Sequence, residues 1–308
     1  MFGTLLGGLP SPDPRAPADA GGAVEAAVRA QDAAGLEPIT DGRLGLVSPF
    51  GSGERAFLAW REPVTVEAWH STAGHTTKAV KQALPGPYSI ARRGGSAARA
   101  RERLAMAAAE ALHHEAAALA AAGCPLIEIE ETEAHRIGAD PAERRLFRAA
   151  HRRLAEGLES THLSLSIVGG SAWEAGPETI LDAPYASLAV DLIAGPDNWR
   201  VVAQAPGDRG IVAGALRAAT AGDDGPEVLL WAAKYAASTG GRGLARVGLG
   251  TAGGLAGLTW AEALEKLMRL GHAARLAGLP PGEELASSVD PRSISARSAA
   301  VGRRTIRR

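Results

Sequence analysis

The chain has 308 residues, of which 46% are hydrophobic, and a formal net charge of −1 at pH 7. This length allows one large buried core, and the near-zero charge gives no electrostatic argument for nucleic acid or a membrane as the main partner. No apolar run reaches the roughly 20 residues that span a bilayer, and the first residues lack the features of a signal peptide. The single cysteine, Cys124, excludes an intrachain disulfide and favours a reducing, cytoplasmic location.

Short apolar runs that end in Gly, Pro or Asp alternate with longer amphipathic runs, as strands and helices do. Residues 43–77 break this pattern with many glycines, and we interpret them as a hairpin-like excursion over one mouth of the fold. Ser96 is the expected N-cap of the longest helix. The expected strands are 2–9, 37–41, 78–84, 125–131, 162–168, 186–193, 211–216 and 244–250. The expected helices are 18–34, 96–122, 141–157, 177–183, 226–239 and 260–277.

Eight strands joined by crossovers that are mostly of helical length predict an α/β fold with a parallel sheet. Their total length, roughly 275 residues, is that of a single (β/α)8 TIM barrel. An open, doubly wound sheet would alternate in the same way, but the first strand is not followed by a GxGxxG turn. We therefore expect a barrel over residues 1–277 and a flexible Arg/Ser-rich tail over residues 278–308.

In such barrels the functional side chains lie at the carboxyl ends of the strands. Alternation along the strands indicates which side chains share a face. Glu128 and Glu130 lie opposite the isoleucines between and beside them, and His162 shares a face with Ser164 and Ser166. Polar rows of this kind are costly in a barrel strand unless they line a polar cavity, although residues at strand ends in solvent would give the same pattern. The candidates at strand ends are Asp41, Arg43, Tyr88, Glu130, Glu131, His162 and Asp191.

Five runs of sequence resemble the catalytic barrel of cobalamin-independent methionine synthases. They are GGLP (7–10), AAVRAQDAAGLEPITDG (26–42), VKQALPGPYSIA (80–91), AGCPLIEIEE (122–131) and THLSLSIVGG (161–170), and the resemblance extends over about residues 2–276. It implies a TIM barrel, in a superfamily that includes the uroporphyrinogen-decarboxylase-like barrels. It also implies a zinc thiolate mechanism, in which zinc held by His, two Cys and Glu binds the sulfur of homocysteine. That sulfur then attacks a methyl group on a reduced folate.

The resemblance places the family's zinc ligands on residues that differ in this chain. The histidine corresponds to His162, the glutamate falls near Asp191, and the two cysteine positions are Ser164 and Gly253. Because zinc sites depend on thiolate or imidazole ligands, the remaining pair, His162 and Asp191, predicts a degenerate zinc site. Tightly bound zinc is not expected.

Other positions of the family pattern predict where a substrate binds. The family's Asp-Glu-Pro is Glu130-Glu131-Thr132 here, and its Asp-Gly-Glu is Asp41-Gly42-Arg43. The turn that contacts the amino acid in the family corresponds to Gly7-Gly8. The predicted substrate-binding residues are Gly7, Gly8, Asp41, Arg43, Tyr88, Glu131 and Ser164.

The first hypothesis is a divergent methionine-synthase-like enzyme that transfers a methyl or one-carbon group on a small amino-acid-like or anionic substrate. Glu130 would be an acid/base or amine anchor, His162 its proton partner, and Arg43 a clamp for an anion. Methyl-tetrahydrofolate is the candidate methyl donor. Two alternatives remain open: a metal-free acid–base enzyme like the decarboxylase branch, or a non-catalytic binding barrel. In each case the expected partner is a small molecule, with no nucleic acid and no membrane.

Overall fold

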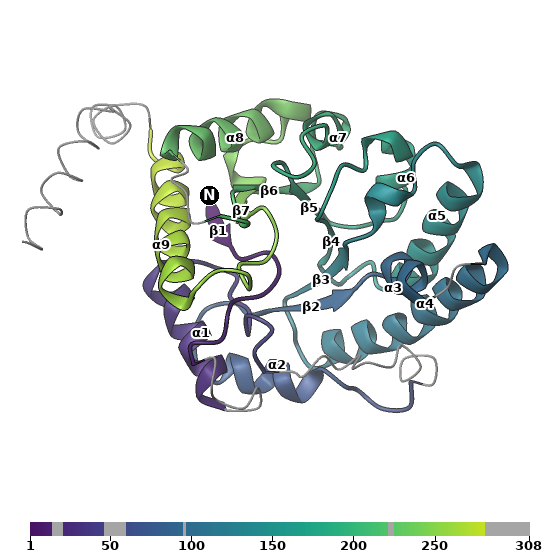
Figure 1. Ribbon diagram of the computed structural model, residues 1–308, viewed down its shortest axis with the longest axis horizontal. Coiled ribbons are helices and arrows are strands. Elements are labelled where there is room, and N and C mark those ends of the chain that lie inside the picture. The colour runs from purple at the N-terminus through teal and green to yellow at the C-terminus, as the bar shows by residue number, and fades with distance from the viewer. Residues whose placement is uncertain (14–20, 46–59, 95–96, 221–224, 281–308) are drawn as a thin grey trace, which may run out of the picture.

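The computed structural model describes residues 1–13, 21–45, 60–94, 97–220 and 225–280. Its strands form one curled parallel sheet of seven strands in the order β1-β7-β6-β5-β4-β3-β2 (Figure 1). Since every pair is parallel, all strands begin at one end of the sheet, the amino end, and finish at the other, the carboxyl end. The strands are β1 Phe2–Thr4, β2 Lys81–Pro85, β3 Leu126–Glu131, β4 Leu163–Ile167, β5 Ser187–Asp191, β6 Gly210–Leu216 and β7 Val247–Thr251.

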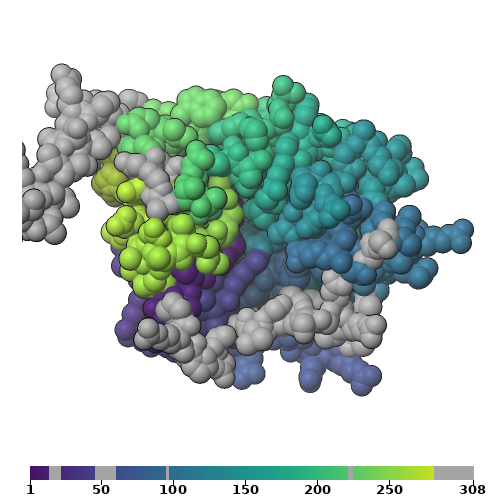
Figure 2. All heavy atoms as spheres, viewed as in Figure 1, coloured from purple at the N-terminus to yellow at the C-terminus, as the bar shows by residue number. Residues whose placement is uncertain are grey.

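The α-helices lie around the outside of the curled sheet (Figure 1). From the same side, the atoms of α5 to α8 form a continuous outer rim (Figure 2). The arrangement is an α/β fold consistent with a TIM-like barrel. The helices are α1 Gly21–Ala33, α2 Val66–Ala73, α3 Pro87–Gly94, α4 Ala98–Ala121, α5 Pro141–Ala155, α6 Pro177–Ile180, α7 Asn198–Gln204, α8 Pro226–Ser238 and α9 Trp260–Ala277.

The expected second strand, 37–41, is reduced to a single parallel β-bridge between Ile39 and Val80. The backbone N–H of Ile39 donates to Ala79 at 2.8 Å, and on the other side the N–H of Glu37 donates to Gly3 at 2.9 Å. Pro38 has no N–H to donate, so it cannot take part in a ladder as a donor. The segment is hydrogen-bonded to both edges of the seven-stranded sheet, although it is not a regular strand.

Alternation along the strands separates two apolar regions. Ile127 and Ile129 on β3, and Leu163, Leu165 and Ile167 on β4, belong to the large core between sheet and helices. The opposite face looks into the sheet interior, which has a small apolar cluster of its own formed by Leu6, Ala189 and Val212 with Phe2 beside them. The predicted faces of β3 and β4 are therefore confirmed, with Glu128, Glu130, Ser164 and Ser166 on the interior side.

Several local expectations differ from the structure or lie outside the described residues. The hairpin-like excursion contains helix α2, while residues 46–59 lie outside the described part of the chain. No helix was expected directly after β2, but α3 begins there, because Pro87 suits the first turn of a helix. The N-cap of α4 is Ala97, and Ser96 is not described. Most of the expected tail, residues 281–308, is also outside the description. Within the described residues, no helix is both long and apolar enough to cross a bilayer.

Candidate functional site

Glu130 is the buried acid at the carboxyl end of β3, with 2% of its surface exposed. One carboxylate oxygen, Oε1, accepts a hydrogen bond from the backbone N–H of Gly7 at 3.2 Å. The other, Oε2, forms an ion pair with Arg43, whose side chain is 50% exposed. Glu130 therefore joins the loop after β1 and the loop after the Ile39 bridge to β3. It is a buried anion with a cationic partner that water can reach.

The glycines beside Glu130 permit a close approach of two loops. Gly7 has a φ of +76°, and a Cβ on it would lie 2.7 Å from the backbone of Gly254. The carbonyl of Gly8 accepts from the N–H of Leu255 at 2.7 Å. Residues larger than glycine would push this loop off Glu130. The predicted substrate-binding residues Gly7 and Gly8 thus lie next to the buried acid, and their role in binding a substrate stays a prediction.

Asp41 and Asp191 hold loops at the carboxyl end of the sheet through hydrogen bonds to the backbone. Asp41 accepts from the backbone N–H of Arg43 at 2.9 Å, and burial raises the pKa of Asp41 while that N–H and the nearby guanidinium oppose the rise. Asp191, 1% exposed, accepts from the N–H groups of Ile193 at 2.9 Å and Ala194 at 2.8 Å through Oδ1. Its other oxygen accepts from the N–H of Gly169 at 3.3 Å. Both carboxylates are occupied by backbone donors.

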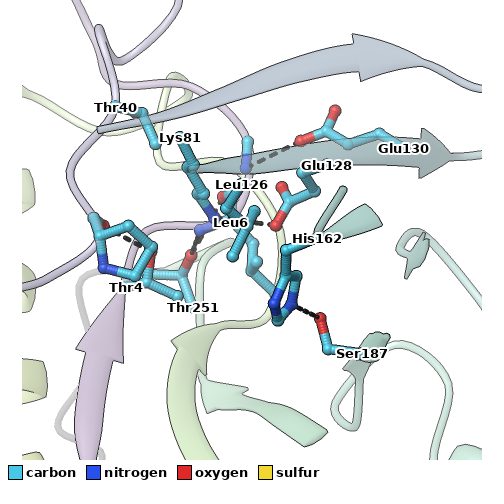
Figure 3. Close-up of polar contacts among 12 residues, drawn as sticks. Thr4, Leu6, Thr40, Lys81, Leu126, Glu128, Glu130, His162, Ser187 and Thr251 are labelled. Carbon is cyan, nitrogen blue, oxygen red and sulfur yellow. Dashed lines mark hydrogen bonds and ion pairs between the residues drawn. The ribbon is translucent and has the colours of Figure 1, made fainter. Parts of the chain in front are cut away.

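His162 lies at the opposite, amino end, because β4 begins only at Leu163. Its Nε2 is 2.9 Å from Ser187 Oγ, and partial burial lowers the pKa of the imidazole. Figure 3 shows Glu130 and His162 on opposite sides of Glu128. The expected Glu130–His162 pair is therefore wrong, and the β4 residue paired with Glu130 is Ser166. The expected remnant metal pair is split in the same way, since Asp191 ends β5 at the carboxyl end.

Glu131 and Tyr88 are fully buried in the helix layer. The carboxylate of Glu131 accepts from the N–H groups of Tyr88 at 2.9 Å and Ser89 at 2.7 Å, the second and third residues of α3. It also accepts from the Ser89 hydroxyl and contacts His151 Nε2 at 2.9 Å. A Cβ on Gly86 would lie 2.1 Å from its Cδ. Glu131 therefore anchors the N-terminus of α3, whereas a substrate contact was predicted for it.

The side chain of Tyr88 points into the same layer. Its hydroxyl donates to Glu143 at 2.7 Å, and burial, followed by Glu143, raises the pKa of the phenol above its usual value. The ring packs edge-on against Phe147. The structure therefore places the Tyr88 hydroxyl in the buried layer beside Glu143, and its predicted contact with a substrate stays a prediction.

Ser164, the remaining predicted substrate contact, lines a cavity of about 510 Å³ at the amino end of the sheet. Sequence reasoning missed the cation beside it: Lys81 Nζ donates to Glu128 Oε2 at 2.8 Å, with both side chains buried. The signal was present, because a lysine inside a predicted barrel strand is almost never buried without a partner.

His151 was missed as well. It links Glu131 to the hydroxyl of Tyr185 at 2.7 Å, and no periodic pattern marks such a contact.

The residues at the carboxyl end do not fit the zinc site of the resemblance. Within the described chain, no group of three or more His, Cys, Asp or Glu side chains is placed to hold a metal ion. Glu130 already binds a guanidinium, and Asp191 binds three backbone N–H groups. Burial raises the pKa of the Cys124 thiol to about 11, and the group lies before β3, where it contacts the Leu126 carbonyl. Zinc needs deprotonated ligands that converge, which this arrangement lacks.

Comparisons with known proteins find a family model that matches part of the chain and solved structures with a similar fold. Residues 56–171 match the model of the cobalamin-independent synthase catalytic domain. No curated protein sequence matches the chain significantly. Among solved structures, a B12-independent methionine synthase from Shewanella sp. W3-18-1, in complex with selenomethionine, superposes with a TM-score of 0.70 at 18% identity, over 89% of this chain and 96% of that one.

Two further structures show the same fold. A Listeria monocytogenes protein assigned to the vitamin-B12-independent methionine synthases has a TM-score of 0.68 at 16% identity, over 92% of this chain and 98% of that one. A methyltransferase from Methanosarcina mazei has a TM-score of 0.52 at 18% identity, over 69% and 63%. Residues 56–171 are therefore similar to the catalytic domain of the cobalamin-independent synthases, and the solved structures share the fold of the chain.

Proposed function

We propose that the protein is a divergent methionine-synthase-like enzyme that transfers a methyl or other one-carbon group on a small amino-acid-like or anionic substrate. The site is the carboxyl end of the sheet, and the reaction proceeds without tightly bound zinc. The single observation that carries this proposal is Glu130, a buried carboxylate whose cationic partner, Arg43, is half-exposed. We further propose that residues 37–40 complete an eight-membered barrel, because they hydrogen-bond to both edges of the sheet.

The ion pair suggests how a substrate is recognised. Arg43 can turn its exposed guanidinium toward an incoming carboxylate or other anion, with which it forms bidentate hydrogen bonds. Glu130 Oε2 is then free to accept a substrate ammonium or to take a proton from the attacking group. An amino-acid-like molecule supplies both a carboxylate and an ammonium. The backbone N–H of Gly7 holds the other oxygen of Glu130 in place meanwhile.

The metal-free acid–base alternative uses the same two residues. The acids at this end are already paired with a guanidinium and with backbone N–H groups. This pairing favours a reaction without a metal. In that case Arg43 would bind the carboxylate of a substrate and Glu130 would move the proton, with no folate involved. A barrel that only binds ligands would retain affinity without turnover, so kinetics separate the three readings.

The test combines metal analysis with calorimetric titration of homocysteine and methyl-tetrahydrofolate and an assay for transfer of a labelled methyl group. We expect less than stoichiometric zinc, binding of an anionic or amino-acid-like ligand, and loss of at least about tenfold in affinity in Arg43→Ala. Glu130→Gln should lose turnover while still binding. The matched controls are Arg29→Ala and Glu25→Gln, which alter an exposed ion pair on α1.

Each outcome decides between the readings. Stoichiometric zinc with homocysteine bound to it would contradict the zinc-free proposal and restore the family mechanism. Tight binding of a carboxylate without methyl transfer would favour the acid–base alternative if turnover of that ligand is found, and the binding barrel if it is not. Equal effects of the exposed-pair controls and the Arg43 and Glu130 variants would remove the site from the carboxyl end.

A further inference from the structure

The cavity at the amino end of the sheet is separate from the proposed catalytic end. It has a volume of about 510 Å³, within the 300–1,000 Å³ range of small-molecule sites. Its rim includes the exposed residues His162, Asp208 and Arg246, and its floor is formed by buried side chains that include Lys81 and Glu128. Figure 3 shows Lys81, Glu128 and His162 around this interior. The cavity therefore opens to solvent and ends at a buried ion pair.

The cavity exists because small residues occupy the inward positions of the sheet. Barrel interiors are normally filled by layers of bulky side chains, but Ser164, Ser187 and Gly210 take such positions here. At Gly248 the ring of Phe2 fills the space of a side chain, because the ring lies 2.3 Å from the position that a Cβ would take. Phe2 therefore packs over β7, and the space before β4 and β5 is left open.

The floor contains a buried hydrogen-bond acceptor with no partner. Glu128 Oε2 accepts from Lys81 Nζ at 2.8 Å, whereas Glu128 Oε1 has no hydrogen-bond partner among the described residues and is shielded from bulk solvent. An unpaired buried carboxylate oxygen is costly. A lysine ammonium has three N–H donors, and one of them is used by Glu128. The floor thus presents an acceptor beside spare donors.

The charges that face the cavity balance. Lys81 offsets Glu128 on the floor, and Arg246 offsets Asp208 at the rim. Partial burial lowers the pKa of His162, so that its imidazole is neutral near pH 7. Transferring a net charge into such a neutral, mainly apolar space is unfavourable. A ligand without net charge suits it best.

We propose that this cavity binds a small uncharged molecule with an apolar body and a carboxamide or hydroxyl head. The N–H or O–H of the head donates to Glu128 Oε1, and its oxygen accepts from Lys81 Nζ. The apolar body lies against Phe2, Leu126 and Ile211, which line the cavity. This site does not depend on the proposed function, because it uses neither Arg43 nor Glu130.

Three nearly isosteric probes test the head group: benzamide, benzoate and benzylammonium, each titrated into the full-length protein by ligand-observed NMR. We expect benzamide to bind at least about tenfold more tightly than either ion. The double variant Lys81→Met/Glu128→Leu removes both charges together, which folded proteins tolerate well. It should lose that preference and bind toluene as tightly as the unmodified protein does.

A second variant places the probe within the molecule. Ala186→Trp adds a ring at the exposed rim of the cavity, and benzamide affinity should fall at least about tenfold as the entrance is filled. Ala203→Trp, at an exposed position of α7 that does not line the cavity, is the matched control. Equal affinity for the three probes would overturn the proposal. So would benzamide binding that survives the Ala186 variant, or no binding at millimolar concentration.

Discussion

The two ends of the sheet treat buried carboxylates differently. At the carboxyl end, Glu130 and Asp191 are surrounded by donors: a guanidinium and one backbone N–H for the first, and three backbone N–H groups for the second. At the amino end, Glu128 has one donor, Lys81, and its other oxygen, beside a cavity, has no partner among the described residues. Satisfied acids fix loops in place, whereas an unsatisfied acid marks the position of a missing donor.

The two ends of the sheet therefore raise separate questions, one about catalysis and one about the stability of the fold. The carboxyl end is where barrel enzymes carry out chemistry, and here the buried acid Glu130 lies beside the half-exposed Arg43. The amino end is expected to stabilise the fold in such barrels, yet here it is hollow. Substitutions at the two ends should therefore differ in their effect on stability.

Lys81→Met should be the most destabilising change, because it leaves Glu128 as a buried charge without a cation. The expected loss is about 3–5 kcal/mol in the free energy of unfolding, measured by urea denaturation. Lys81→Met/Glu128→Leu should recover most of it. If the single variant is as stable as the double one, groups other than Lys81 already stabilise the charge of Glu128. The carboxylate at the amino end would then not lack hydrogen-bond donors.

Arg43→Ala should cost less, about 1–3 kcal/mol. Glu130 remains buried, but the removed guanidinium was half-exposed, so water can partly take its place. Arg29→Ala, from the exposed pair with Glu25, should change stability by less than about 1 kcal/mol. A loss in Arg43→Ala no larger than that of Arg29→Ala would mean that Glu130 is solvated and that the proposed clamp is only a surface contact.

Asp191→Asn should cost about 1 kcal/mol. The amide keeps one oxygen for the N–H groups of Ile193 and Ala194, but its NH₂ would face the N–H of Gly169. We expect faster amide hydrogen exchange at Gly169 and unchanged exchange in β2, as measured by NMR. Unchanged exchange at Gly169 would show that the loop after β4 is held by other contacts.

The smallest effect concerns pH. Burial lowers the pKa of His162 in the folded state, so the unfolded chain binds the proton first as pH falls below about 6.5. The contribution of His162 to stability is therefore complete above that pH and is lost progressively below it. His162→Gln should flatten this part of the stability curve, measured by thermal unfolding from pH 7.5 to 5. A steeper curve in the variant would contradict the assigned direction.

Alternation in the sequence predicts which face of the sheet a side chain lies on better than it predicts how far along the strand the residue lies. Alternation placed Glu130 and Ser166 on the interior side, and the structure confirms it, because apolar residues on β3 and β4 pack under the helices. The last helix, Trp260–Ala277, agrees with the structure to the residue. It begins at a capping box in which Thr259 and Glu262 exchange hydrogen bonds.

The position of a residue along its strand is what alternation leaves open. His162 continues the polar row of β4, so the pattern extends past the start of the strand without a break. Only the register with β3, in which Ile127 N–H donates to the His162 carbonyl at 3.0 Å, shows that His162 lies at the amino end. In the same way, Glu131 follows Glu130 in sequence but points to the other face. Its helix-anchoring role depends on α3, a helix that was not among those expected from the sequence.

The contact between Gly86 and Glu131 has a consequence for any attempt to recombine this chain with its relatives. The carboxylate occupies the space of a side chain at position 86, and it also holds the first N–H groups of α3. A larger residue at 86 is tolerated only with a smaller one at 131, which in turn releases the helix. The two positions must be exchanged together, and a chimera with a crossover between residues 86 and 131 should fold poorly where it combines a residue larger than glycine at 86 with Glu131.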